Sequence, residues 1–96
     1  MKNIEEYDDR FSEKLHITIG QNIKRIRKSK KISQLNLAHA IGYKSVSPIS
    51  CAEIYYNKIH FNVEQLVKIA YVLDVPISDF FHGIDCKNLN IQMINK

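Results

Sequence analysis

The stretch that decides the fold is SQLNLAHAIGYKSVSPISCAE, residues 33–53. Ser33 is a favourable N-cap because its side-chain oxygen can accept a hydrogen bond from the first turn of the helix that follows. Gly42 is a typical helix stop because glycine adopts a left-handed backbone without steric cost. These two signals predict a short helix at residues 34–41.

The second half of this stretch predicts another short helix, at about residues 46–54. Pro48 would break a helix interior, but it fits the first turn if Ser45 is the N-cap. Two short helices joined by a tight turn that contains glycine are the outline of a helix-turn-helix. In such a motif Ala38 must be small where the helices cross closely, and Ile49 must be apolar to hold the second helix on the core.

Hydrophobic spacing predicts two helices before this stretch, at residues 3–15 and 18–30. Each carries apolar side chains three or four positions apart, which is the period of an amphipathic helix. The apolar positions are Ile4, Tyr7, Phe11 and Leu15 in the first helix, and Ile19, Ile23 and Ile26 in the second. The other face is acidic in the first helix and basic in the second.

One more helix and a final turn are predicted after the stretch. Asn62 is an N-cap candidate with Gln65 as its capping-box partner, and the helix extends to about residue 73. Its apolar row is Val63, Leu66, Ala70 and Leu73. Pro76 opens a last turn anchored by Val75, Phe80 and Phe81. The tail, residues 82–96, fits a strand, a frayed helix or disorder. With no strand pattern elsewhere, the chain is predicted to be all-α with five or six helices.

The charge of the chain is concentrated in one segment. The net charge is +4. Residues 1–15 hold three basic and five acidic groups, whereas residues 16–32 hold no acid. The basic residues of the second segment are Lys24, Arg25, Arg27, Lys28, Lys30 and Lys31. Such a block is typical of a surface that binds a polyanion, and a solvated helix face is the alternative interpretation.

Four segments together resemble the phage-repressor and Cro type of helix-turn-helix, also called the Xre-like family. They are IGQNIKRIR at 19–27, ISQ at 32–34 with Leu37 and Ala38, Ile49 with Glu53, and LVKIAYVLDV at 66–75. The resemblance covers about residues 17–81. It implies a compact five-helix lambda-repressor-like DNA-binding domain, to which this chain adds an N-terminal helix and a short C-terminal tail.

The resemblance also implies roles for individual residues. Arg27 matches the first-helix arginine of the family and Glu53 matches the acid at the end of the recognition helix, and these two usually form a partly buried ion pair. Gln34 matches the glutamine that, with helix N-terminal N–H groups, clamps a DNA phosphate. Ser33 is mainly the cap of that helix.

The recognition helix is expected to turn its small side chains towards DNA. Matching backwards from Glu53 places Ser45, Val46, Ser47, Ser50 and Cys51 outward. None of these makes a bidentate base contact, so direct readout of bases is expected to be thin. The remaining phosphate or base contacts are assigned to Lys44, Asn57 and Lys58. The turn before this helix, from Gly42 to Ile49, is longer than is usual in the family. The loop after it, from Glu53 to Leu66, is also longer.

Several other classes of protein do not fit the sequence. No nucleophile–base pair, paired carboxylates or glycine-rich phosphate loop indicates an enzyme, and no cofactor is expected. His82 and Cys86 alone are too few ligands for a zinc site. The two cysteines do not indicate a disulfide framework. Without an 18-residue apolar run or a signal peptide, the chain is expected to avoid membranes and to be cytoplasmic.

We therefore expect a sequence-specific regulator that binds double-stranded DNA as a homodimer on a near-palindromic operator, as a repressor or control protein. The alternative is an antitoxin or interaction module that neutralises a partner protein and autoregulates its operon; a toxin or a polymerase would be the protein partner. Residues 1–16 form an N-terminal amphipathic segment, residues 17–81 the DNA-binding domain and residues 82–96 a tail for dimerisation. Self-association is assigned to residues 75–94 together with the N-terminal apolar row.

Overall fold

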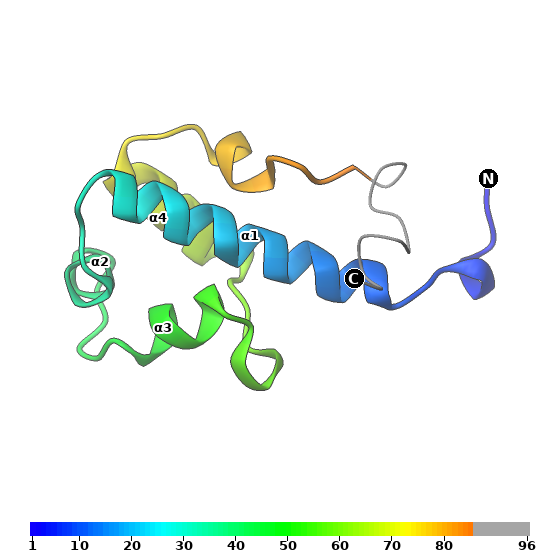
Figure 1. The fold of residues 1–96 in the computed structure, drawn as a ribbon, viewed down its shortest axis with the longest axis horizontal. Coiled ribbons are helices and arrows are strands. Elements are labelled where there is room, and N and C mark those ends of the chain that lie inside the picture. Colours follow the sequence, from blue (N-terminus) through cyan, green and yellow to red (C-terminus); the bar gives the residue numbers. More distant parts are fainter. Residues whose placement is uncertain (86–96) are drawn as a thin grey trace.

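A computed structural model of the chain describes residues 1–85, which contain only helices and turns (Figure 1). The all-α prediction is therefore confirmed over this range. The four α-helices are α1 Arg10–Ser29, α2 Gln34–Ala40, α3 Ser47–Glu53 and α4 Val63–Leu73. Three short 3-10 helices accompany them, η1 Ile4–Glu6, η2 Tyr56–Lys58 and η3 Ile77–Phe81.

A single long helix replaces the two helices that were predicted before residue 30. The separate N-terminal helix was a wrong prediction: a 3-10 turn at Ile4–Glu6 precedes α1, which runs unbroken from Arg10. The cause lies in residues 16–18, which contain no glycine or proline that would end a helix. The apolar row also keeps its spacing across this point, since Leu15 and Ile19 are four residues apart.

The core lies on the second half of α1. The buried positions of α1 begin at Ile19, so its first two turns project as an arm beyond the other elements (Figure 1). The α1 helix packs against α3 and η3, and α2 packs against both α3 and α4. The fully buried large apolar side chains are Ile23, Leu37, Ile49, Ile69, Leu73 and Phe80.

Buried Asn22 fastens η3 to α1. Its side-chain amide donates hydrogen bonds to the carbonyl oxygens of Phe80 and His82, each at 2.9 Å. Because both acceptors are backbone atoms at a helix end, the amide satisfies groups that would otherwise lack partners. The turn after α4 is thereby held beside α1, and the Phe80 ring is fully buried.

Three helices end in the same way, although only one of them has the glycine that signals it. In α2 the N–H of Tyr43 bonds the Ala38 carbonyl at 2.9 Å, across a left-handed Gly42 with φ of +97°. The ends of α1 and α4 repeat this Schellman pattern with a left-handed Lys31 and a left-handed Asp74. Glycine therefore predicts one of these three ends.

The capping predictions hold for α2 and α4 and fail for α3. The Ser33 Oγ accepts a hydrogen bond from the Asn36 N–H at 3.0 Å, and Asn62 and Gln65 form a capping box. In contrast, α3 begins at Ser47 after an N-cap Val46 that makes no side-chain bond. Ser45 is therefore not the cap, and Pro48 occupies the first turn as expected.

One apolar residue of α4 is exposed although it was predicted to be in the core. Val63 was placed in the core row, but its side chain is 74% exposed. The buried residues of α4 are Leu66, Ile69, Ala70 and Leu73. Val63 lies at the first position of the helix, where the row of buried side chains has not yet met the core.

Gly20 sets the closest approach between α1 and α3. A Cβ at this position would lie 2.6 Å from the Glu53 carbonyl oxygen and 2.8 Å from that of Ala52, and both obstacles are backbone atoms. We expect Gly20→Ala to lower the free energy of unfolding by about 3 kcal/mol, because the two helices must move apart. Urea unfolding measures the change. Gln21→Ala, at the exposed neighbouring position, is the control, and equal stability of the two variants would contradict this packing.

Candidate nucleic-acid interface

The outward side of α3 presents small side chains. Ile49, Ala52 and Glu53 face the core, whereas Ser47 is exposed and Ser50 and Cys51 are half-buried. The spacing of 47, 50 and 51 places these three on one helix face. Lys44, Ser45 and Val46, predicted on or near this helix, lie in the segment that leads into it, with Val46 half-buried.

The inward end of α3 is fixed by a buried ion pair. Arg27 donates from Nε to the Glu53 Oε2 at 2.7 Å and from Nη2 to Oε1 at 3.0 Å. The Glu53 side chain is fully buried and that of Arg27 is 6% exposed, so the pair is deeper than the resemblance implied. The Arg27 Nη1 also donates to the Ile32 carbonyl at 2.7 Å. This geometry connects α1 to α3 and to the turn before α2.

Gln34 joins the same network. Its Nε2 donates to the Glu53 Oε1 at 2.9 Å, which leaves the side chain half-buried against the ion pair. Ser33, its neighbour, is exposed and caps α2. The assignment of Gln34 as a phosphate contact stays a proposal, and the structure gives its side chain a partner within the protein.

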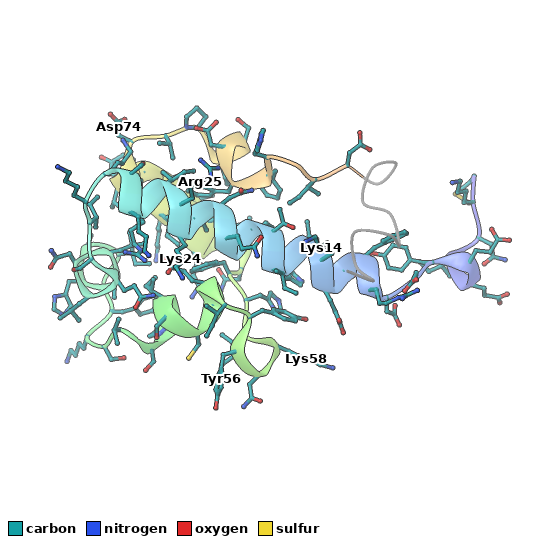
Figure 2. All side chains as sticks on the ribbon, in the orientation of Figure 1. Lys14, Lys24, Arg25, Tyr56, Lys58 and Asp74 are labelled. Atoms are coloured by element: carbon teal, nitrogen blue, oxygen red, sulfur yellow. The ribbon has the colours of Figure 1, made fainter. Side chains whose placement is uncertain are left out.

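The loop after α3 has a strained backbone and carries two of the predicted DNA contacts. Tyr55, Asn57 and Lys58 have φ angles of +56°, +53° and +64°. Non-glycine residues in this left-handed region cost about 1 kcal/mol or more each, so the surroundings must hold them. Asn57 and Lys58 are exposed at the tip of the loop. Figure 2 shows Lys58 and Tyr56 there, on the side of α3 away from α2.

A stack of three rings holds this loop against α1. The imidazole of His16 lies parallel to that of His60, with 3.7 Å between the ring centroids, and at 5.9 Å from the ring of Tyr55. The His60 Nδ1 is 2.9 Å from the carbonyl oxygen of Lys58. Burial lowers the pKa of His16, and the charge of His60 lowers it further. Both effects favour the neutral imidazole in the folded chain.

The basic side chains of residues 24–31 do not all point to one surface. Arg27 points into the core and is neutralised by Glu53. Arg25 lies beside η3, where it lines a shallow hollow with Asp79 and His82 (Figure 2). Lys28, Lys30 and Lys31 are exposed near the end of α1. A single basic face made of all six residues is therefore not what the fold presents.

Two residues that the sequence reasoning missed belong to the same surface. Ile54 is 63% exposed directly after α3, and Tyr56 is 58% exposed in the following loop. Ile54 stands seven positions after Ser47, so the helical register of the outward face could have identified it. Tyr56 had no such signal, because its position depends on the left-handed backbone of the loop.

Other kinds of site receive no support from the described residues. Within residues 1–85, no three side chains of His, Cys, Asp or Glu gather as metal ligands would. Cys86, considered above with His82, lies outside the described residues. None of the described helices has the length and apolar character needed to cross a membrane.

Comparison with known proteins identifies one family. A family model described as helix-turn-helix matches residues 23–80. This range includes α2, α3 and α4, the ion pair and the strained loop. No curated protein and no solved structure matches the chain.

The ring stack predicts that stability falls in weak acid. Since the pKa of His16 is lowered from its ordinary value of 6.5, its contribution is complete above that pH and is lost as the pH falls below it. We expect the melting temperature to drop between pH 7 and 5.5, and to drop less in His16→Phe, which keeps a ring that cannot be protonated. His39→Gln, an exposed position on α2, is the control. An equal drop in His16→Phe and the unaltered chain would contradict the role of the stack.

Proposed function

The chain belongs to the helix-turn-helix family of the phage-repressor and Cro type, a family of DNA-binding regulators, and we propose that it acts as a homodimer on a near-palindromic operator. Within this proposal it serves as a repressor or control protein. The observation that carries it is the orientation of α3: its inner end is fixed by the Arg27–Glu53 pair, and its outer side of small residues is left in solvent.

In the proposed interface one set of residues positions the protein on the DNA backbone, and another set lies against the bases. Gln34, Lys44, Asn57 and Lys58 contact phosphates, and the cap Ser33 presents the α2 N-terminus. Ser45, Val46, Ser47, Ser50 and Cys51 lie nearest the bases in this arrangement. Valine can contact a thymine methyl and serine is permissive, so much of the sequence choice comes from DNA shape.

The division of the chain into residues 1–16, 17–81 and 82–96 stays a proposal, in which residues 17–81 form the DNA-binding unit. Since α1 begins at Arg10, the segment 1–16 is largely the arm of a longer helix. The assignment of self-association to residues 75–94 and to the N-terminal apolar row also stays a proposal, and residues 86–94 lie outside the described part.

A hollow on the arm supports the alternative, an antitoxin or interaction module. The hollow holds about 440 Å³. Its apolar lining consists of Ile4, Tyr7, Phe11, Leu15 and Ile84. It lies outside the range that the family model matches, and none of its lining residues is among the DNA contacts proposed above. A stoichiometric protein that co-purifies with the unaltered chain and is lost with Phe11→Asp would favour this function.

The salt dependence of DNA binding tests the main proposal. From the phosphate contacts above we expect a slope equivalent to about 4–8 released counterions per dimer. Lys58→Ala should weaken binding to all sequences alike and lower the slope by about one counterion per half-site. Lys14→Ala removes the same charge from the arm (Figure 2) and should change neither. A binding constant that salt does not alter would contradict the proposal.

Ser47→Ala separates base reading from phosphate contact. Because Ser47 is the exposed residue at the start of α3, its loss should change the preference at one base of each half-site. Selection of bound fragments from a random DNA pool, performed on the variant and on the unaltered chain, measures the preference. Identical selected sequences would show that the register proposed for the helix is wrong.

A further inference from the structure

Ile54 is a large apolar side chain in solvent, next to the residues proposed to lie against the bases. It is 63% exposed and directly follows the last residue of α3. Because the backbone up to Glu53 is helical, residue 54 still follows the helical register, three positions after Cys51 and four after Ser50. Ile54 therefore continues the outward row of α3, and it is the largest side chain in that row.

The residues on both sides of Ile54 are held in place. Glu53, immediately before it, is fully buried and accepts hydrogen bonds from side chains of α1 and of the start of α2. Tyr55, immediately after it, has a left-handed backbone, and its ring stacks on that of His16 with 5.9 Å between the centroids. The backbone of Ile54 is thus fixed from both ends. A ligand that covers its side chain has little backbone freedom to remove, which favours binding.

The surroundings of Ile54 suit a polyanion. Lys44 precedes α3 and Lys58 follows it, and both are exposed. Within residues 44–60 the only acid is Glu53, whose charge is buried in the ion pair. This segment therefore places positive charge at both ends of the face and no exposed carboxylate beside Ile54. Such a surface favours the approach of a DNA backbone over that of a basic protein.

We propose that Ile54 contacts the C5-methyl group of a pyrimidine in the major groove, once in each half-site of the operator. The proposal rests on the DNA-binding function proposed above and names one group that the protein recognises. In the major groove the apolar group that a base edge presents is this methyl, carried by thymine and by cytosine methylated at C5. The outward row of α3 has no side chain for a bidentate hydrogen bond to a base, so an apolar contact contributes directly to the choice of sequence.

The contact proposed for Ile54 is separate from the one open to Val46. Val46 is half-buried and stands at the other end of α3, eight positions earlier. At a rise of about 1.5 Å per residue the two positions are about 12 Å apart along the helix, which is more than three base-pair steps of about 3.4 Å. A methyl group recognised by Ile54 therefore belongs to a different base pair from one recognised by Val46.

Removal of single methyl groups from a bound duplex tests the proposal. The probe is the tightest-binding fragment that the unaltered chain selects from a random DNA pool, resynthesised with deoxyuridine at one thymine position of each half-site at a time. Deoxyuridine keeps the hydrogen-bonding groups of thymine and lacks its methyl. We expect one position at which the dissociation constant rises about four-fold per half-site, or about fifteen-fold for the symmetric pair, as for one buried methyl group. Fluorescence anisotropy measures the constant.

Three variants assign the methyl contact to Ile54. Ile54→Ala should bind the unmodified fragment as weakly as the unaltered chain binds the deoxyuridine fragment, and deoxyuridine at the sensitive position should weaken it no further. Ile54→Val keeps a branched apolar side chain and should retain most of the sensitivity. Val67→Ala, which shortens another exposed branched side chain on α4, is the matched control and should retain all of it. Because both side chains lie mostly in solvent, all three variants should keep the melting temperature of the unaltered chain.

A cytosine at the sensitive position distinguishes the two sources of the methyl group. If Ile54 recognises the methyl in either base, methylation of this cytosine at C5 should strengthen binding about four-fold per half-site in the unaltered chain and have no effect in Ile54→Ala. Sensitivity at thymine without this gain at cytosine supports the proposal for thymine alone.

The outcomes separate this proposal from the proposed function. A selected fragment in which no thymine methyl affects binding overturns the role of Ile54 and leaves DNA binding intact. So does a methyl group whose loss weakens Ile54→Ala as much as the unaltered chain, which is the result expected if Val46 alone makes such a contact. Failure of the unaltered chain to select any fragment contradicts the proposed function and this proposal together.

Discussion

The carboxylate of Glu53 is the point on which the arrangement of the first three helices depends. It lies at the end of α3 with no exposure and accepts bonds from Arg27 and Gln34, which come from α1 and α2. Burying this charge without hydrogen-bond partners would cost much free energy. The three helices are therefore held in the arrangement in which Arg27 and Gln34 both reach the Glu53 carboxylate. Gly20 allows the same end of α3 to meet the backbone of α1. The outward direction of Ser47, Ser50 and Cys51 follows from this anchor.

The loop after α3 depends on a second and weaker constraint. Its left-handed residues are held by hydrogen bonds within the loop and by the rings of Tyr55 and His60 against His16. The long α1 therefore makes two kinds of contact. Its second half, from Ile19, packs in the core, and His16, one turn earlier, supports the loop that presents Lys58. His16 can reach the loop because the helix continues through residues 16–18, where a break was expected.

Local signals in the sequence predicted much of the fold. Ser33, Gly42, Asn62 and Pro76 mark the ends of elements where the structure has them, because each acts through its own backbone or its own short side chain. Lys31 and Asp74 end helices without any such mark. The exposure of Val63 and the close approach at Gly20 depend on contacts between elements distant in the chain. Tyr56 could not be placed on the candidate site in advance, because its position depends on the left-handed backbone of the loop.

A double-mutant cycle between Arg27 and Glu53 tests the central claim most directly. Arg27→Met and Glu53→Gln should each lower the free energy of unfolding by about 3–5 kcal/mol, because each leaves a buried group without its partner. The double variant should lose no more than the worse single variant, which gives a coupling of about 3 kcal/mol. Effects that add, with a coupling below about 1 kcal/mol as for a surface pair, would contradict the claim that this ion pair anchors α3.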